Sequence, residues 1–245
     1  MDGNKTRRMA RLFGEDGKCL VVAMDHAGFM DKVLPGLAQP KDTIRAAARA
    51  GANAFLLTAG SARLAADALG HAGVWLSVDT QPPLLDRIAE TALRIGADGI
   101  KCMVYPGWDA QPNSVAQLGA LAADCARWNI PLMAEVIPGG FIAGPEMRTP
   151  EKIAAGARIA MEAGADVIKT FYTGDPASFR TVVDYCLVPL VVLGGERVKN
   201  DAELLDNVRD ALAAGAAGVA IGRNIWQHPA PEEITARLVA LVHAR

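Results

Sequence analysis

This chain of 245 residues has few aromatic residues, no clustered cysteines and a net charge close to zero. Only 5% of the residues are aromatic although 51% are hydrophobic, so the apolar content consists of small side chains, among them 45 alanines. This hydrophobic content excludes a disordered segment. With 25 Lys and Arg against 27 Asp and Glu, the formal net charge is only −2, which excludes a broad basic surface for nucleic acid or a polybasic membrane anchor. We therefore expect no nucleic acid and no membrane as partner, but a small neutral or anionic ligand.

Metal-binding patterns and targeting segments are also missing. The cysteines stand far apart, at Cys19, Cys102, Cys125 and Cys186. No two histidines have the spacing of a pair of metal ligands; they are His26, His71, His228 and His243. We therefore expect no metal, no other cofactor and no disulfide framework. The N-terminal residues lack the apolar stretch of a secretory signal, and no run approaches ~18 apolar residues. The sequence thus predicts a soluble, cytoplasmic protein.

Eight short apolar runs predict buried strands. They are nearly continuous rather than alternating, as expected of parallel strands covered on both faces. The runs span residues 19–24, 54–57, 74–78, 99–104, 132–136, 167–170, 190–193 and 218–221. Alanine-rich segments with helical charge spacing separate them, at 84–95, 114–128, 150–163, 177–186, 202–214 and 231–243. A short basic helix over 5–13 precedes the first strand.

A weak internal repeat indicates how these elements close. Four similar segments lead a helix into strands two, four, six and eight: AGANAFLL from residue 50, IGADGIKC from 95, AGADVIKT from 163 and AGAAGVAI from 214. Such internal symmetry favours a closed barrel over an open doubly wound sheet. The sequence predicts an α/β fold, a (βα)8 TIM barrel formed by residues 1–245 as a single domain. Residues 1–18 form a short N-terminal extension that closes the bottom of the barrel.

Two lysines occupy equivalent positions in the even strands. Counting five residues from the glycine of each repeat reaches one interior layer of Leu56, Lys101, Lys169 and Ala220. Burial and a neighbouring positive charge both disfavour an ammonium group, so at least one of Lys101 and Lys169 should have a lowered pKa. A neutral amine there can form an imine with a carbonyl substrate. The alternative is that both lysines form salt bridges with inward carboxylates such as Asp25 or Glu135.

Glycines follow strands seven and eight, where barrels frequently bind phosphate. Exposed backbone N–H groups at Gly194, Gly195 and Gly222, together with Arg223 or Arg197, predict an anion site. Tight strand-to-helix turns without a ligand are the alternative.

Polar residues at the ends of strands one and five complete the predicted site. Asp25 and His26 lie on the catalytic face, where an aspartate can orient hydroxyls or accept a proton, or merely cap a helix. Glu135 is expected to serve as acid or base, or to neutralise a buried lysine.

Four segments, in this order along nearly the whole chain, resemble motifs of the class I aldolases grouped as DeoC, DhnA-type fructose-bisphosphate aldolase and LacD. They are VVAMDHA from residue 21, ADVIKTFYTGD from 165, VPLVVLGG from 188 and GVAIGRNIWQHPAP from 218. The resemblance implies that Lys169, in VIKT, forms the Schiff base, and that Asp25, in MDH, lies in the active site. It implies that phosphate is bound by Gly194, Gly195, Gly222 and Arg223, and that the protein is a homo-oligomer.

One position departs from the fructose-bisphosphate aldolase pattern. Those members carry a tyrosine acid/base in a Y-P-R-G motif after strand five, whereas this chain reads VIPGG from residue 136, and Ile137 cannot transfer a proton. The autoinducer-2 aldolase/thiolase (LsrF-like) branch shows such a loss, and GRNIWQHP resembles it too. ADGIKCMVY, with Lys101, is similar to the LacD branch.

These features predict a metal-independent class I aldolase acting on a phosphorylated ketose or related phosphorylated carbonyl compound. Lys169 attacks the carbonyl, Asp25 or Glu135 accepts the hydroxyl proton, and His26 contacts the substrate. Lys101 is expected to lower the pKa of Lys169 and to bind a substrate oxygen. Two alternatives remain: thiolase-type acyl transfer from a phosphorylated diketone to coenzyme A, and a non-catalytic sugar-phosphate-binding barrel.

Overall fold

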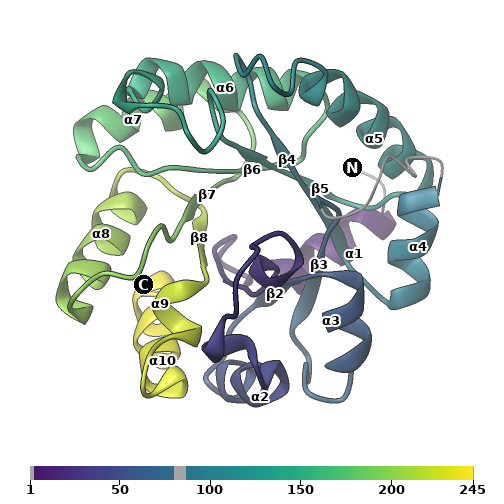
Figure 1. Ribbon diagram of the computed structural model, residues 1–245, viewed down its shortest axis with the longest axis vertical. Coiled ribbons are helices and arrows are strands. Elements are labelled where there is room, and N and C mark those ends of the chain that lie inside the picture. The colour runs from purple at the N-terminus through teal and green to yellow at the C-terminus, as the bar shows by residue number, and fades with distance from the viewer. Residues whose placement is uncertain (1–2, 80–86, 245) are drawn as a thin grey trace.

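Eight parallel strands form a closed barrel in the computed structural model, which describes residues 3–79 and 87–244 (Figure 1). The strands are β1 (Cys19–Ala23), β2 (Ala54–Leu57), β3 (Gly73–Ser77), β4 (Gly99–Val104), β5 (Leu132–Val136), β6 (Val167–Thr170), β7 (Leu190–Leu193) and β8 (Gly218–Ile221). Each strand pairs with its successor and β8 pairs with β1. The predicted (βα)8 TIM barrel is confirmed. Only two strands differ from the predicted ranges: β1 ends one residue earlier, and β3 begins and ends one residue earlier.

Helices surround the barrel (Figure 1). They are α1 (Gly3–Leu12), α2 (Pro40–Arg49), α3 (Ala59–Leu64), α4 (Ile88–Ile95), α5 (Ser114–Trp128), α6 (Pro150–Glu162), α7 (Pro176–Tyr185), α8 (Asp201–Ala213), α9 (Arg223–Trp226) and α10 (Pro231–Val242). Of the predicted helix 84–95, residues 84–86 lie outside the described residues. Pro150 and Pro231 occupy first turns, where their missing N–H costs nothing, and Gly96 ends α4 in the left-handed conformation. No helix of the described ranges is long and apolar enough to cross a membrane.

The N-terminal extension packs against the lower end of the barrel. Leu12 and Phe13 are buried in the same apolar cluster as the inward side chains of the strands. Arg11 forms an ion pair with Asp98, at the start of β4, and Gly73 is required because a Cβ there would lie 2.6 Å from the Arg11 carbonyl oxygen. The extension thus fills the barrel end opposite the carboxyl ends of the strands.

The first and last strands meet at a narrow seam. Cys19 pairs with Gly218, and Val22 pairs with Ile221. Gly218 has a φ of +148°, and a Cβ at this position would overlap the backbone of Cys19. Glycine is therefore the residue that lets β8 approach β1 and close the barrel.

Strand register places both lysines in the upper interior. Glu135 pairs with Lys169 across β5 and β6, and with Met103 across β4 and β5. Lys101 precedes Met103 by two residues, which is the offset that strand tilt introduces between alternate strands of such a barrel. Lys101 and Lys169 thus belong to one layer, as the repeat spacing predicted.

Candidate active site

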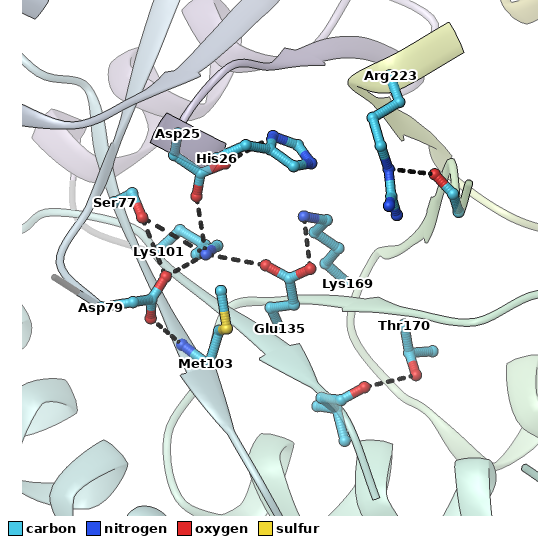
Figure 2. A network of polar contacts seen from close by, with 12 residues as sticks. Asp25, His26, Ser77, Asp79, Lys101, Met103, Glu135, Lys169, Thr170 and Arg223 are labelled. Atoms are coloured by element: carbon cyan, nitrogen blue, oxygen red, sulfur yellow. Dashed lines mark hydrogen bonds and ion pairs between the residues drawn. The ribbon is translucent and has the colours of Figure 1, made fainter. Parts of the chain in front are cut away.

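Lys101 is the centre of a buried charge network (Figure 2). Its side chain is completely buried, and its Nζ lies 3.0 Å from Asp25 Oδ2 and 2.9 Å from Glu135 Oε2. Asp79 forms a third ion pair, and the Ser77 hydroxyl lies 3.5 Å away. Burial alone would lower the pKa of Lys101, but the three carboxylates hold it well above its usual value. The lowered pKa predicted for at least one of the two lysines is therefore not found at Lys101, and the alternative of salt bridges to inward carboxylates is present there.

Lys169 has a different environment in the same layer. Its side chain is 6% exposed, and its Nζ lies 2.7 Å from Glu135 Oε1. This is its one ion pair within the described part of the chain. Unlike Lys101, Lys169 lines the cavity at the carboxyl ends of the strands. It is therefore the lysine that a substrate can reach, whereas Lys101 lies outside the cavity lining; that Lys101 binds a substrate oxygen stays a prediction.

That cavity has a volume of about 520 Å³ and collects nearly every predicted site residue. Those lining it are Asp25, His26, Glu135, Lys169, Gly194, Gly195, Gly222 and Arg223. Ile137 forms part of the wall. It stands at the position that corresponds to the tyrosine acid/base of the Y-P-R-G motif. Its volume suits a ligand of sugar-phosphate size.

The two carboxylates on the cavity side are kept ionised by the lysines. Burial alone would raise the pKa of Asp25, but Lys101 and Lys169 lower it to about 2. The same two lysines lower the pKa of Glu135 against the effect of burial. Asp25 precedes a short 3-10 helix, η1 (His26–Gly28), without a capping hydrogen bond from its side chain. The alternative that Asp25 merely caps a helix is therefore wrong. The alternative that Glu135 neutralises a buried lysine is supported by its ion pairs with Lys101 and Lys169.

His26 is a neutral imidazole on the cavity wall. Burial lowers its pKa to about 4 even though Asp25 opposes this effect. The ring packs edge-on to Trp226, with centroids 5.5 Å apart, and its Nδ1 lies 3.7 Å from Asp25 Oδ1. At neutral pH, His26 can donate one hydrogen bond and accept another.

The predicted anion site lies where β7 and β8 end. Gly195 has a φ of +61°, and a Cβ on Gly222 would lie 2.5 Å from the Ala23 carbonyl oxygen, so both positions require glycine. These glycines thus also make the tight strand-to-helix turns that were the alternative to an anion site. Arg223 donates from Nε to the Gly195 carbonyl at 3.1 Å and forms an ion pair with the exposed Glu196.

Sequence reasoning missed Asn224, which joins the two glycine loops. Its Oδ1 accepts a hydrogen bond from Val198 N at 2.9 Å, and its Nδ2 donates to the carbonyls of Gly194 and Glu196 at 3.0 and 3.1 Å. Asn224 is 3% exposed. It fixes the loop after β7 against the start of α9.

Asp79 was also missed. Its carboxylate contacts Lys101 and accepts the backbone N–H of Met103. Burial raises its pKa, although Lys101 opposes this. The available signal was its place just after strand three, which corresponds to that of Asp25 after strand one.

Within residues 3–79 and 87–244, no group of three or more His, Cys, Asp or Glu side chains is arranged to hold a metal ion. This arrangement presents one reachable amine beside a carboxylate, in the cavity that the predicted anion site also lines.

Comparison with known proteins gives consistent matches. A family model described as "DeoC/LacD family aldolase" matches residues 19–228. The chain is 36% identical over 250 residues to 2-amino-3,7-dideoxy-D-threo-hept-6-ulosonate synthase of Halobacterium salinarum, covering 99% of this chain and 92% of the relative. It is 31% identical to the class 1 fructose-bisphosphate aldolase of Thermoproteus tenax, covering 98% and 95%.

Solved structures match over the same length. A Schiff-base-forming fructose-1,6-bisphosphate aldolase superposes with a TM-score of 0.84 at 31% identity, covering 98% of this chain and all of the other. An archaeal fructose-1,6-bisphosphate aldolase, with its catalytic lysine covalently bound to a carbinolamine intermediate, gives the same TM-score and identity over 97% and 99% of the two chains.

Proposed function

The chain belongs to the DeoC/LacD aldolase family and is a Schiff-base-forming, class I aldolase, and we propose that Lys169 is its imine-forming residue. We also propose that its substrate is a phosphorylated ketose or a related phosphorylated carbonyl compound. The observation that carries the assignment is that Lys169 lines the cavity whereas Lys101 is enclosed by three carboxylates.

Imine formation begins with transfer of the Lys169 ammonium proton to Glu135, whose Oε1 is 2.7 Å away. The amine then adds to the substrate carbonyl. The carbinolamine hydroxyl takes the proton back from Glu135 and leaves as water, which gives the iminium and returns Glu135 to its carboxylate form. During imine formation Asp25 stays ionised and orients hydroxyl groups. Lys101 acts as a positioning residue that fixes the carboxylates of Asp25 and Glu135.

Carbon–carbon cleavage requires a base for the hydroxyl beyond the bond that breaks. Ile137 cannot serve, so Glu135 or Asp25 accepts this proton while the bonding electrons move into the iminium and form an enamine. Glu135 is the better placed of the two because it already contacts Lys169. Protonation of the enamine carbon and hydrolysis of the imine regenerate the amine.

The phosphate is proposed to bind at Gly194, Gly195, Gly222 and Arg223, with His26 donating to a substrate hydroxyl. The glycines allow close approach of an oxyanion to backbone N–H groups. Arg223 would exchange its exposed partner Glu196 for the phosphate.

Borohydride reduction in the presence of fructose 1,6-bisphosphate and related ketose phosphates tests the assignment. We expect a covalent adduct on the Lys169 peptide, detected by mass spectrometry, and loss of both adduct and turnover in Lys169→Met. The surface variant Lys152→Met is the matched control and should behave as the wild type. Normal turnover by Lys169→Met would contradict the proposal.

A second candidate is thiolase-type transfer of an acyl group from a phosphorylated diketone to coenzyme A. The replacement of tyrosine by the wall residue Ile137 favours it. Product analysis with and without coenzyme A decides, since cleavage that proceeds equally well without coenzyme A excludes this reaction.

Homo-oligomerisation and a cytoplasmic location stay predictions from the sequence. Light scattering after size-exclusion chromatography measures the first, and fractionation of the source cells measures the second.

A further inference from the structure

Arg148 is a cationic residue of the cavity wall that the proposed reaction does not use. It lies at the end of the loop from β5 to α6. Its guanidinium is 4.5 Å from the ring centroid of Phe171, which also lines the cavity. Nη1 donates to the Pro138 carbonyl, and Nη2 donates to the Gly140 carbonyl at 2.6 Å. The side chain is therefore fixed in place although it is half-buried.

The charge of Arg148 is not balanced as the other cavity cations are. Lys169 is paired with Glu135, and Arg223 is paired with Glu196. For Arg148, the partners in the described ranges are carbonyl oxygens and an aromatic ring, with no carboxylate in an ion pair. Burial lowers its pKa although the charge of Glu146 opposes this effect. A half-buried guanidinium that contacts no carboxylate is stabilised when an anion joins it.

Arg148 also has hydrogen-bond donors to spare. A guanidinium carries five N–H groups, and carbonyls of the β5–α6 loop occupy only part of this set. The remaining donors have the planar arrangement that matches a carboxylate or phosphate.

The position of Arg148 is distinct from that of the predicted phosphate site. Arg148 comes from the loop after β5, whereas Gly222 and Arg223 follow β8, three strands further around the barrel. Both groups line one cavity, with Lys169 on its wall as well. A substrate can therefore have one anionic end at Arg223, its carbonyl at Lys169 and a second anionic end at Arg148.

We propose that Arg148 binds an oxyanion, phosphate or carboxylate, on the end of the substrate remote from Gly222 and Arg223, and so selects substrates charged at both ends. This inference rests on the proposed sugar-phosphate site but not on imine formation.

Calorimetric binding of carbonyl-free ligands tests it. The probes are glucitol 6-phosphate, 6-phosphogluconate and glucitol 1,6-bisphosphate, which share one phosphate and differ in the other end: hydroxymethyl, carboxylate or phosphate. We expect the wild type to prefer at least one doubly charged ligand by about tenfold or more over glucitol 6-phosphate. The preferred end, carboxylate or phosphate, identifies the oxyanion.

Arg148→Gln should lose this preference while binding glucitol 6-phosphate nearly as well as the wild type. Arg148→Lys, which keeps the charge, should retain part of it, and Lys152→Gln, which removes a nearby exposed charge, should retain all of it. Equal weakening for all three ligands would overturn the proposal, because it would mean that Arg148 only supports the loop. A wild type without any preference would overturn it as well. Failure of the borohydride test alone would refute imine formation and leave this result standing.

Discussion

Glu135 and Lys169 are register partners on adjacent strands, and their side chains meet at 2.7 Å at the wall of the cavity. Because the carboxylate is the proposed acid/base, Glu135→Gln should keep the cavity shape but lower carbon–carbon turnover by about 10²- to 10⁴-fold. Single-turnover kinetics should show that the borohydride adduct also forms more slowly, because Glu135 accepts the Lys169 ammonium proton as well. Turnover close to the wild-type rate would assign the proton transfer to another group.

The two lysines should differ in their effect on stability. Lys101→Met leaves Asp25, Asp79 and Glu135 buried without their common cation, and we expect a loss of about 3–5 kcal/mol in the free energy of unfolding. Lys169→Met removes one partner from Glu135, which keeps Lys101, so its loss should be clearly smaller. Urea unfolding measures both. Equal losses would mean that the network does not depend on Lys101 as its centre.

Acid should destabilise the protein through His26 before Asp25 and Glu135, whose pKa values are lowered, take up protons. The pKa of His26 is lowered to about 4 in the folded state, against about 6.5 in the unfolded chain, so the unfolded state binds the extra proton between these values. The stability from neutral His26 is complete above pH 6.5 and falls as the pH approaches 4. It amounts to about 2 kcal/mol between pH 7 and pH 5.

Comparison of the wild type with His26→Asn in urea at pH 7 and pH 5 measures this contribution. The variant should lose less stability over the interval. Asp25, with a pKa lowered to about 2, contributes only at lower pH, so it does not affect this window. Identical pH dependence of the two proteins would show that His26 is not buried as a neutral ring.

Asn224 should control phosphate affinity without touching the reacting carbon. Asn224→Ala removes the bonds to Val198, Gly194 and Glu196, which releases the loop after β7. We expect KM for a phosphorylated substrate to rise about tenfold with kcat nearly unchanged, and stability to fall by about 1–3 kcal/mol. Inhibition by inorganic phosphate should weaken in parallel. An unchanged KM would separate this loop from the phosphate site.

Periodicity was enough to predict the barrel, because each strand is a continuous apolar run and the Gly-Ala repeats mark the even strands. The same repeat placed Lys101 and Lys169 in one layer. It could not predict the sign of the Lys101 pKa shift, which depends on one carboxylate in β5 and on two that follow β1 and β3. Arg148 carried no signal, since its approach to the cavity follows from the path of the β5–α6 loop and from Phe171.

The seam between β1 and β8 sets when the active site can form during synthesis. Asp25 follows the first strand, whereas Gly222 and Arg223 follow the last, so these groups become neighbours only after Gly218 has docked against Cys19. Contacts that join residues so far apart in the chain form slowly, because a long loop must close first. A nascent chain that has not yet extruded β8 therefore holds both lysines but cannot be a competent catalyst.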